Sequence, residues 1–394
     1  MTALPEPATG RIRELDGVRG LAILLVLVWH YLVCEVGAPP PLFRILNVTW
    51  SGVDLFFVLS GFLIGGILID HRDAPNYFSV FYRRRICRIF PLYYAFFLAF
   101  VLLRHRLELG AASAWLFERP MPLWSYATFT QNFLMAKTGS LGPAALAATW
   151  SLAIEEQFYL LLPIVIRFVP VRRLPYVLAP FIAVAPMARM WFYGRDGASV
   201  GWEVLLICKT DALLLGVVCA WLIRRYGVRL AAAASFLRIA FFSCLGFVAL
   251  AQYVTVTPAI SMLIHSFLAV GFAALILLVL VTPASPIARL TRVRWLRWLG
   301  VVSYGVYVIH ELILGIVYGV ARRDWPHFLS LRDLVLPAIA LVVTLLVAAA
   351  SYRWFERPIL DIGRRWEYAK PSRPAAIPSA APAAAPSPRA PPPR

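Results

Sequence analysis

An arginine and a histidine lie eleven residues apart in the apolar stretch LDGVRGLAILLVLVWHYL, which is long enough to cross a bilayer as a helix. In an α-helix this spacing is about three turns plus 20° and about 16 Å of rise, so Arg19 and His30 would share one face. Asp16, one turn earlier, can hold the Arg19 guanidinium. We interpret Arg19 and His30 as catalytic candidates, because a buried imidazole can serve as a general base or a nucleophile. The alternatives are a snorkelling anchor for Arg19 and an interhelical hydrogen bond for His30.

A second group of polar residues is scattered over other apolar stretches. A charge costs at least about 2.5–3.5 kcal/mol at the bilayer centre, so each of them needs a reason to be there. Counting about 1.5 Å of rise per residue from the predicted helix ends brings them, with His30, to one depth in the outer half of the membrane. They are Asp54, Ser60, Glu155, Lys209, Asp211 and His310.

We predict that Glu155 is catalytic, and that Asp16 and the other members apart from Lys209 bind substrate or support the catalytic groups. The alternative is that buried ion pairs only stabilise the helix bundle, for example Lys209 with Asp211 or with Glu155.

Two arginines lie one helical turn apart in FYRRRICRIFPLYY, at the predicted cytoplasmic mouth of the third helix. At this spacing Arg85 and Arg88 can bind phosphate groups through charge-assisted, bidentate hydrogen bonds. The alternative is the ordinary excess of positive charge in cytoplasmic loops, which we prefer for Arg83 and Arg84. Spacing alone leaves both interpretations open for Arg85 and Arg88.

The composition indicates that these groups lie in a membrane protein. Hydrophobic residues make up 61% of the chain and charged residues 15%, against about 45–50% and about 25% in a soluble domain. We predict an all-α polytopic bundle of about ten transmembrane helices. The helices are placed near 16–36, 49–69, 88–104, 149–168, 174–193, 203–223, 239–257, 260–281, 298–320 and 333–351. Residues 122–136 are too short and polar to span, so we expect a re-entrant or interfacial segment there.

The basic residues follow a topological pattern. If the N-terminus is inside, most of the 38 Lys and Arg residues fall in the inner loops and tails, so we predict that both termini are cytoplasmic. The net charge of +18 does not indicate nucleic-acid binding, because the basic residues are scattered between apolar spans. The five cysteines show no CxxC or metal-ligand spacing, and we expect neither a disulfide framework nor a metal.

The chain is predicted to hold one membrane domain, at 16–358, between a short cytoplasmic segment at 1–15 and a cytoplasmic tail at 359–394. From about residue 371 the tail is rich in proline and alanine and has nothing to bury. We expect it to be disordered and assign it no catalytic role.

Six segments carry a resemblance to a known family. In chain order they are LDGVRGLAILLVLVWH, GVDLFFVLSGFLI, RRRICRIFPLYY, TWSLAIEEQFYLLLP, DALLLG and SYGVYVIH, and they resemble the acyltransferase 3 family of bacterial membrane acyltransferases. The resemblance runs from about Leu15 to about Pro358. Its most specific mark is the Arg-x10-His pattern on Arg19 and His30, followed by an Arg-x-x-Arg-x-x-Pro pattern that begins at Arg85.

The resemblance implies an acyl-CoA-dependent O-acyltransferase of the bacterial inner membrane. Members transfer an acyl group, usually acetyl, from cytoplasmic acyl-CoA to a hydroxyl of an envelope carbohydrate such as O-antigen, exopolysaccharide or a glycolipid. It implies that His30 serves the chemistry, as general base or covalent acyl carrier, and that Arg85 and Arg88 hold the CoA phosphates. Lys209 departs from the pattern, because the family would have an arginine before the DALLLG run.

Two other classes of protein compete with this interpretation. Intramembrane charges also mark the pathways of transporters, and a non-catalytic flippase of envelope precursors would need similar groups. We find no inverted repeat and no paired Gly- or Pro-broken helices in matching halves of the sequence, which disfavours a transporter.

Overall fold

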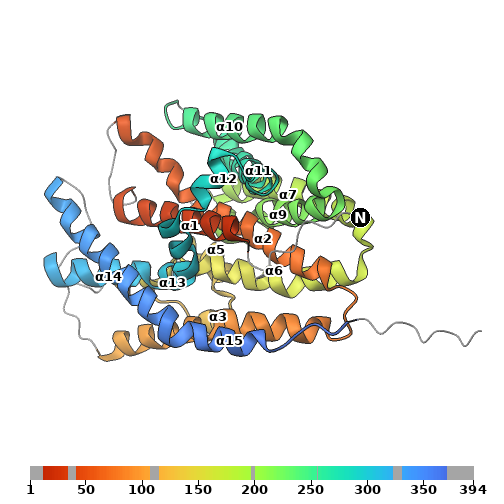
Figure 1. Ribbon diagram of the computed structural model, residues 1–394. Coiled ribbons are helices and arrows are strands. Elements are labelled where there is room, and N and C mark those ends of the chain that lie inside the picture. The colour runs from red at the N-terminus through yellow and green to blue at the C-terminus, as the bar shows by residue number, and fades with distance from the viewer. Residues whose placement is uncertain are drawn as a thin grey trace, which may run out of the picture.

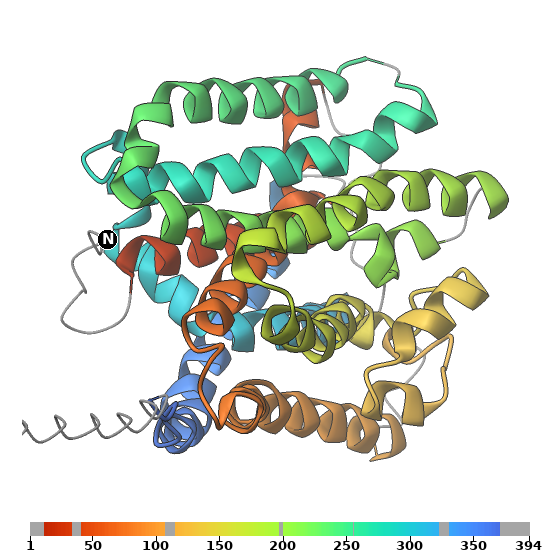
Figure 2. The ribbon, with the colours of Figure 1, turned by 90° about the vertical axis from the view of Figure 1, so that its right-hand side faces the viewer.

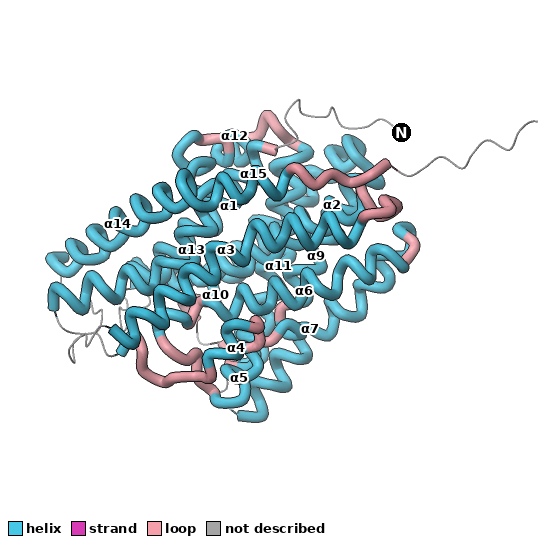
Figure 3. The backbone as a smooth tube through the Cα atoms, turned by 90° about the horizontal axis from the view of Figure 1, so that it is seen from below, coloured by secondary structure: helices cyan, strands magenta, loops and turns pink. Residues whose placement is uncertain are grey.

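The computed structural model describes residues 12–33, 41–106, 115–196, 200–254, 256–322 and 331–370, and its regular structure there is entirely helical (Figure 3). Within these ranges nine helices are long and apolar enough to cross a membrane. They span Arg13–Val33, Arg44–Asp70, Tyr77–Arg104, Ala144–Phe168, Val171–Arg195, Arg229–Ala251, Pro258–Val281, Arg294–Arg322 and Val335–Arg364. The predicted all-α polytopic bundle is confirmed. The predicted disorder from about residue 371 lies outside the described residues.

The sixth predicted span, near 203–223, is not one continuous helix. It consists of α8 (Gly201–Val204), a single 3₁₀ turn at Leu206–Cys208 and α9 (Thr210–Tyr226). The backbone is extended at Leu205, with φ −94° and ψ 137°, and α9 alone has 17 residues. Such a break at membrane depth is tolerated where protein surrounds it. The single helix predicted near 203–223 is thus a broken segment, and nine candidate spans are found in the described residues where about ten were predicted.

The predicted non-spanning segment is present as two short helices, α4 (Leu123–Ala127) and α5 (Gln131–Thr138). Gln131 and Asn132 are fully buried, and Asn132 donates a hydrogen bond to the Val204 carbonyl at 3.1 Å. The segment therefore packs against α6 (Thr149–Phe168) and α8 inside the bundle, where its polar groups have partners.

Two closely packed helix pairs form the centre of the bundle: α1 (Arg13–Val28) with α13 (Arg294–Arg322), and α2 (Gly52–Asp70) with α9. Both pairs meet at glycines, which allow backbones to approach closely. A Cβ added to Gly20 would lie 1.9 Å from the Leu296 carbonyl oxygen, and one added to Gly61 would lie 1.8 Å from that of Leu213. Neither contact leaves room for a larger residue.

Other helices surround this centre (Figures 1 and 2). On one side α10 (Ala234–Ala251) packs on α11 (Pro258–Val281), and on the opposite side α15 (Arg357–Arg364) packs along α3 (Tyr77–Arg106). The remaining long helices are α7 (Leu174–Asp196) and α14 (Val335–Ser351), with the short α12 at Pro286–Thr291.

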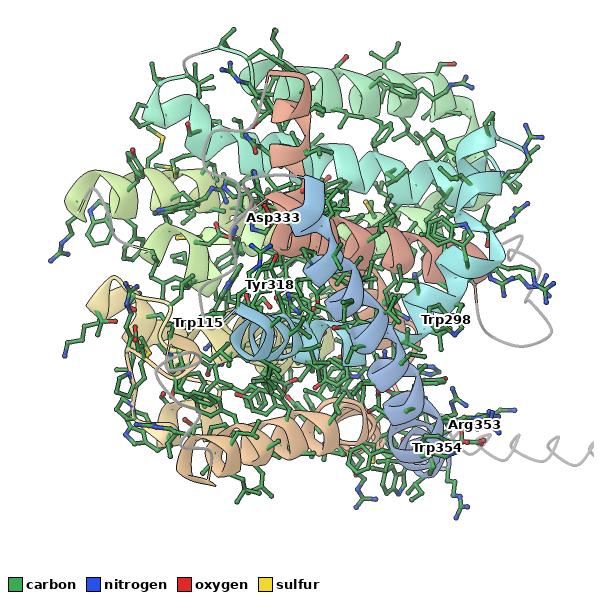
Figure 4. The ribbon with its side chains drawn as sticks, turned by 90° about the vertical axis from the view of Figure 1, so that its left-hand side faces the viewer. Trp115, Trp298, Tyr318, Asp333, Arg353 and Trp354 are labelled. Carbon is green, nitrogen blue, oxygen red and sulfur yellow. The ribbon has the colours of Figure 1, made fainter. Side chains whose placement is uncertain are left out.

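The outside of the bundle is apolar. Trp298 and Trp354 lie on it (Figure 4), and Trp354 is 74% exposed. Long apolar side chains on α7, α10 and α14 are also exposed, among them Phe181, Phe242 and Leu346. A surface of this kind matches the hydrocarbon core of a bilayer.

A segment after α15 crosses one end of the bundle. The Tyr368 ring stacks on His71 with centroids 4.0 Å apart, and the Ala369 amide donates to Asn76 Oδ1 at 2.9 Å. Arg84 Nε donates to the Trp366 carbonyl at 2.8 Å. We call this end, where α1 begins and α15 ends, the arginine-rich end, and residues 365–369 the strap.

Candidate functional site

The two candidate histidines are brought together because α1 and α13 run parallel. Gly20 meets Gly300 near the arginine-rich end, and His30, ten residues further along α1, meets Glu311, eleven residues further along α13. Since both helices rise about 1.5 Å per residue, nearly equal spacing from the glycine contact places these groups at nearly equal depth.

His30, His310 and Glu311 form one group, which we call the histidine cluster. His30 Nε2 lies 3.3 Å from Glu311 Oε1, and the two imidazole ring centroids are 4.8 Å apart in an edge-to-face arrangement. His310 is fully buried, and its Nε2 has no hydrogen-bond partner in the described structure. Glu311 was not singled out from the sequence, although it follows His310 directly.

The first helix is not regular over its whole length, contrary to the assumption behind the Arg19–His30 spacing. Residues Trp29–Val33 form a π-helical turn, in which hydrogen bonds run from i to i+5. His30 Nδ1 bonds to the Val26 carbonyl oxygen at 2.9 Å. His30 lies within this turn and contacts Glu311 of α13. Such π-helical turns are frequent at functional sites.

A partly open cavity of about 130 Å³ lies among α1, α2, α3, α6 and α13. We call it the arginine cavity. Arg19, Arg85 and Arg88 line it toward the arginine-rich end, and Ser151 and Tyr307 line its other end. His30 is not among its lining residues, so of the Arg19–His30 pair only Arg19 lines this cavity.

The arginines of this cavity differ in their partners. Arg19 interacts with Asp16 at 3.7 Å, which confirms the predicted pair. The Arg85 guanidinium lies 6.0 Å from the Tyr159 ring centroid, and that of Arg88 lies 5.8 Å from the Tyr304 centroid. Neither Arg85 nor Arg88 forms an ion pair within 4 Å with a carboxylate of the described chain. Two half-buried cations without such a partner can bind an anion.

Glu155 lies in the arginine cavity and not in the histidine cluster. Its electrostatic and hydrogen-bonding neighbours are Ser60, Tyr159, Arg85 and Arg19. Ser60 and Tyr159 are themselves joined by a hydrogen bond of 2.6 Å between their hydroxyls. Ser60 and Glu155 are thus brought together, as expected from their depth, but away from His30.

A short chain of hydrogen bonds links the arginine cavity to the histidine cluster. The hydroxyls of Ser151 and Tyr307 are in direct contact at the end of the cavity. Tyr307 also donates to the Ala148 carbonyl at 3.0 Å, and the Ala148 amide donates to Glu311 Oε2 at 3.1 Å. Ser151 and Tyr307 were missed in the sequence. Tyr307 shares a helical face with His310 at i, i+3, which could have suggested it.

The other predicted site residues lie in two separate charge networks. Lys209 Nζ is 3.5 Å from Asp54 Oδ1 and 3.0 Å from Glu203 Oε2, while His265 Nδ1 is 3.1 Å from Asp54 Oδ2. Both Lys209 and Asp54 are almost fully buried. The suggested pairing of Lys209 with Asp211 or Glu155 is therefore wrong.

Asp211 forms a buried ion pair with Arg189, 2.7 Å between Nη2 and Oδ2, and accepts a hydrogen bond from Ser266. Because each charge in these networks has a close partner, we assign Asp54 and Asp211 to holding α2, α7, α9 and α11 together.

The histidine cluster is also the one group in the described residues whose side chains could approach a metal ion. Its ligand atoms lie within 4.8 Å of one another. Ligands of a tetrahedral zinc at about 2.0–2.1 Å would be about 3.4 Å apart, so the cluster would have to contract. The cluster as it stands fits a metal poorly.

Comparison with known proteins supports the resemblance of the motifs. An acyltransferase domain model matches residues 12–353. The chain is 28% identical to the putative peptidoglycan O-acetyltransferase YrhL of Bacillus subtilis, over 90% of this chain and 56% of that protein. It is 24% identical to the peptidoglycan O-acetyltransferase OatA of Listeria monocytogenes, over 89% of this chain and 56% of the relative.

A third relative, the O-acetyltransferase OatA of Staphylococcus aureus, is 27% identical over 89% of this chain and 57% of its own length. The chain thus spans a little more than half the length of these relatives. No solved structure matches it. Since the family model covers nearly all of the chain apart from its ends, this protein belongs to the acyltransferase 3 family.

Proposed function

We propose that this protein is an integral membrane O-acyltransferase that takes an acyl group, in the simplest case acetyl, from acyl-CoA and places it on a hydroxyl of a cell-envelope carbohydrate. The observation that carries the proposal is the pair Arg85 and Arg88, two guanidiniums that line the arginine cavity and form no ion pair within 4 Å with a carboxylate of the described residues. They suit the phosphates of CoA, which are too polar to enter the bundle themselves.

The shape of the arginine cavity supports a thioester donor. The thin pantetheine arm of CoA would run from Arg85 and Arg88 past Arg19 toward Ser151 and Tyr307. The thioester would then lie next to the hydrogen-bond chain that leads to Glu311 and His30. A donor held in this way loses little further freedom before reaction, which is where much of enzymatic rate enhancement arises.

His30 is the group we propose for the chemistry. The acceptor oxygen attacks the thioester carbonyl carbon, its proton passes to an imidazole nitrogen, and the carbon–sulfur bond breaks so that the thiolate leaves and is protonated. The other route is a covalent acyl-imidazole formed on His30 before transfer to the acceptor. Both routes need an imidazole at the end of the donor channel.

The arrangement favours a donor on the cytoplasmic side and an acceptor near the opposite membrane surface. With the arginine-rich end in the cytoplasm, the positive-inside bias is satisfied and acyl-CoA reaches Arg85 and Arg88 directly. The acceptor class is suggested by the printed names of relatives, two of which are called peptidoglycan O-acetyltransferases. O-antigen, exopolysaccharide and glycolipids are further acceptors of the same chemistry.

The proposal is tested with purified protein in detergent or nanodiscs and acetyl-CoA labelled in the acetyl group. The wild-type protein should transfer the label to a glycan acceptor or release it slowly to water. His30→Ala should bind acetyl-CoA but lose the reaction, because the substitution removes the reacting imidazole while an apolar residue remains compatible with the membrane. Label transfer by His30→Ala at the wild-type rate would refute the role of His30, and a transporter or flippase would leave the thioester intact.

A further inference from the structure

The tautomers of both histidines in the cluster follow from their backbone partners. His30 Nδ1 lies 2.9 Å from the Val26 carbonyl oxygen, and His310 Nδ1 lies 2.7 Å from the Tyr307 carbonyl oxygen. A carbonyl oxygen can only accept, so each Nδ1 carries the hydrogen. In a neutral ring with that tautomer, Nε2 carries a lone pair. The lone pair of His30 Nε2 then faces Glu311, whose Oε1 lies 3.3 Å away.

This geometry places two acceptors against each other. His30 Nε2 and Glu311 Oε1 are 3.3 Å apart, and neither a lone pair nor a carboxylate oxygen can donate. A proton between the two atoms turns this repulsion into a charge-assisted hydrogen bond. The resting His30–Glu311 pair therefore holds one proton more than a neutral imidazole next to a carboxylate would.

His310 Nε2 is the third acceptor. It has no partner in the part of the chain that the structure describes, and the residue is fully buried. Tyr31 holds the backbone there, because its hydroxyl donates to the His310 carbonyl at 3.0 Å and contacts Thr344 Oγ1 at 2.8 Å. Buried polar atoms without a partner are rare and need an explanation. The centroid of the His30 ring, which carries the extra proton, lies 4.8 Å from that of His310. Receiving this proton would explain why His310 Nε2 has no other partner.

We propose that Glu311 and His310 are positioning residues that form a proton relay with His30. Glu311 keeps the extra proton at His30 Nε2, and His310 Nε2 receives it when the acceptor arrives. His30 Nε2 is then free to take the proton of the acceptor hydroxyl as its oxygen attacks the thioester carbonyl. His30 then gives the proton of the acceptor hydroxyl to the departing thiolate, and the proton on His310 returns to His30, so one proton enters and one leaves for each acyl group transferred. The relay rests on the proposed function.

The same three atoms could in principle hold a metal ion, and the distances favour the proton. A zinc ion would need all ligand atoms about 3.4 Å apart, whereas those of the cluster extend to 4.8 Å. A shared proton needs only two atoms to be close at a time, and His30 Nε2 and Glu311 Oε1 are 3.3 Å apart.

The test uses His310→Asn, whose amide nitrogen replaces Nδ1 as donor to the Tyr307 carbonyl but leaves no atom in place of Nε2. We expect kcat to fall about 100-fold or more with an unchanged KM for acetyl-CoA, because loss of proton transfer costs about 10²–10⁴ in rate. The matched control is His265→Asn, which removes another buried membrane histidine outside this cluster and should change kcat by less than about threefold.

A second pair of measurements separates a relay from a packing role. Free imidazole should raise the rate of His310→Ala about tenfold, because it supplies the missing acceptor, and should not affect His310→Asn, in which the space is filled. Glu311→Gln should lower kcat with KM unchanged while its amide oxygen still accepts from Ala148.

Wild-type kcat in His310→Asn, or no imidazole rescue of a folded His310→Ala, would overturn the relay. So would one equivalent of bound zinc that is lost in His310→Asn. If instead the wild-type protein leaves acetyl-CoA intact, the proposed function itself fails. Failure of the relay alone would be seen only in the variants, so the two failures are distinguishable.

Discussion

The contact between α1 and α13 offers a perturbation far from the reacting groups. Gly20 meets the Leu296 carbonyl oxygen so closely that an added Cβ would lie 1.9 Å from it. Ordinary contacts of a Cβ begin near 3.4 Å, so Gly20→Ala must separate the two helices by about 1.5 Å. Backbone atoms cannot yield as a flexible side chain can. We therefore expect the two helices to move apart as bodies.

The displacement is large compared with the geometry of the cluster. His30 Nε2 and Glu311 Oε1 are already 3.3 Å apart, and an added shift of even 0.5 Å takes them out of hydrogen-bonding range. A misplacement of about 1 Å can cost about 100-fold in rate. We expect Gly20→Ala to lower acetyl transfer by about that factor, even in molecules that insert and fold.

The assay compares purified Gly20→Ala with Gly246→Ala, measuring transfer of labelled acetyl and thermal unfolding in the same detergent. Gly246 lies on α10, where an added Cβ would meet nothing within 4 Å, so its substitution should change neither quantity appreciably. Wild-type transfer by Gly20→Ala would show that the α1–α13 register does not position His30. Equal losses in both variants would point to a general effect of alanine in the bundle.

Two other predictions concern the arginine-rich end. Arg85→Ala and Arg88→Ala should each raise the KM for acetyl-CoA about 10- to 100-fold with little change in kcat, because a phosphate contact is made equally in ground and transition states. Saturation kinetics with unchanged KM and a collapsed kcat would contradict this. Burial against the strap lowers the pKa of His71, which follows α2 outside the spanning helices, below its ordinary value of about 6.5. The neutral ring therefore stabilises its stack on Tyr368 above that pH, and this stability is lost as the pH falls. The protection factor of the Ala369 amide against hydrogen exchange, taken relative to the intrinsic rate at each pH, should fall on acidification in the wild-type protein. A protection factor that does not change with pH, or an equal fall in His71→Phe, would refute this.

The fold followed from hydropathy, because the need to satisfy every backbone group in lipid leaves few alternatives to a helix bundle. The error at 203–223 arose because an apolar window does not report a break that is buried in protein. Leu205 is extended between two short helical pieces, and its neighbours Glu203 and Lys209 are paired with each other. Such partners come from tertiary packing, which the period of a single segment does not contain.

The sequence predicted how deep the site residues lie in the membrane but not which of them are neighbours. Counting residues brought His30 and His310 to one level, and they are in contact. The same count placed Glu155 with His30, although it lies with Ser60 and Tyr159 in the arginine cavity. Depth depends only on helical rise, whereas neighbours depend on helix rotation and on the π turn at Trp29–Val33.

The most direct test of the central claim is a structure of the protein in a lipid nanodisc with acetyl-CoA bound, determined with His30→Ala so that the donor stays intact. The account predicts CoA phosphates within hydrogen-bonding distance of Arg85 and Arg88, the pantetheine arm in the arginine cavity, and the thioester beside Tyr307. Acetyl-CoA bound at the opposite end of the bundle, or a cavity left empty at saturating acetyl-CoA, would contradict it.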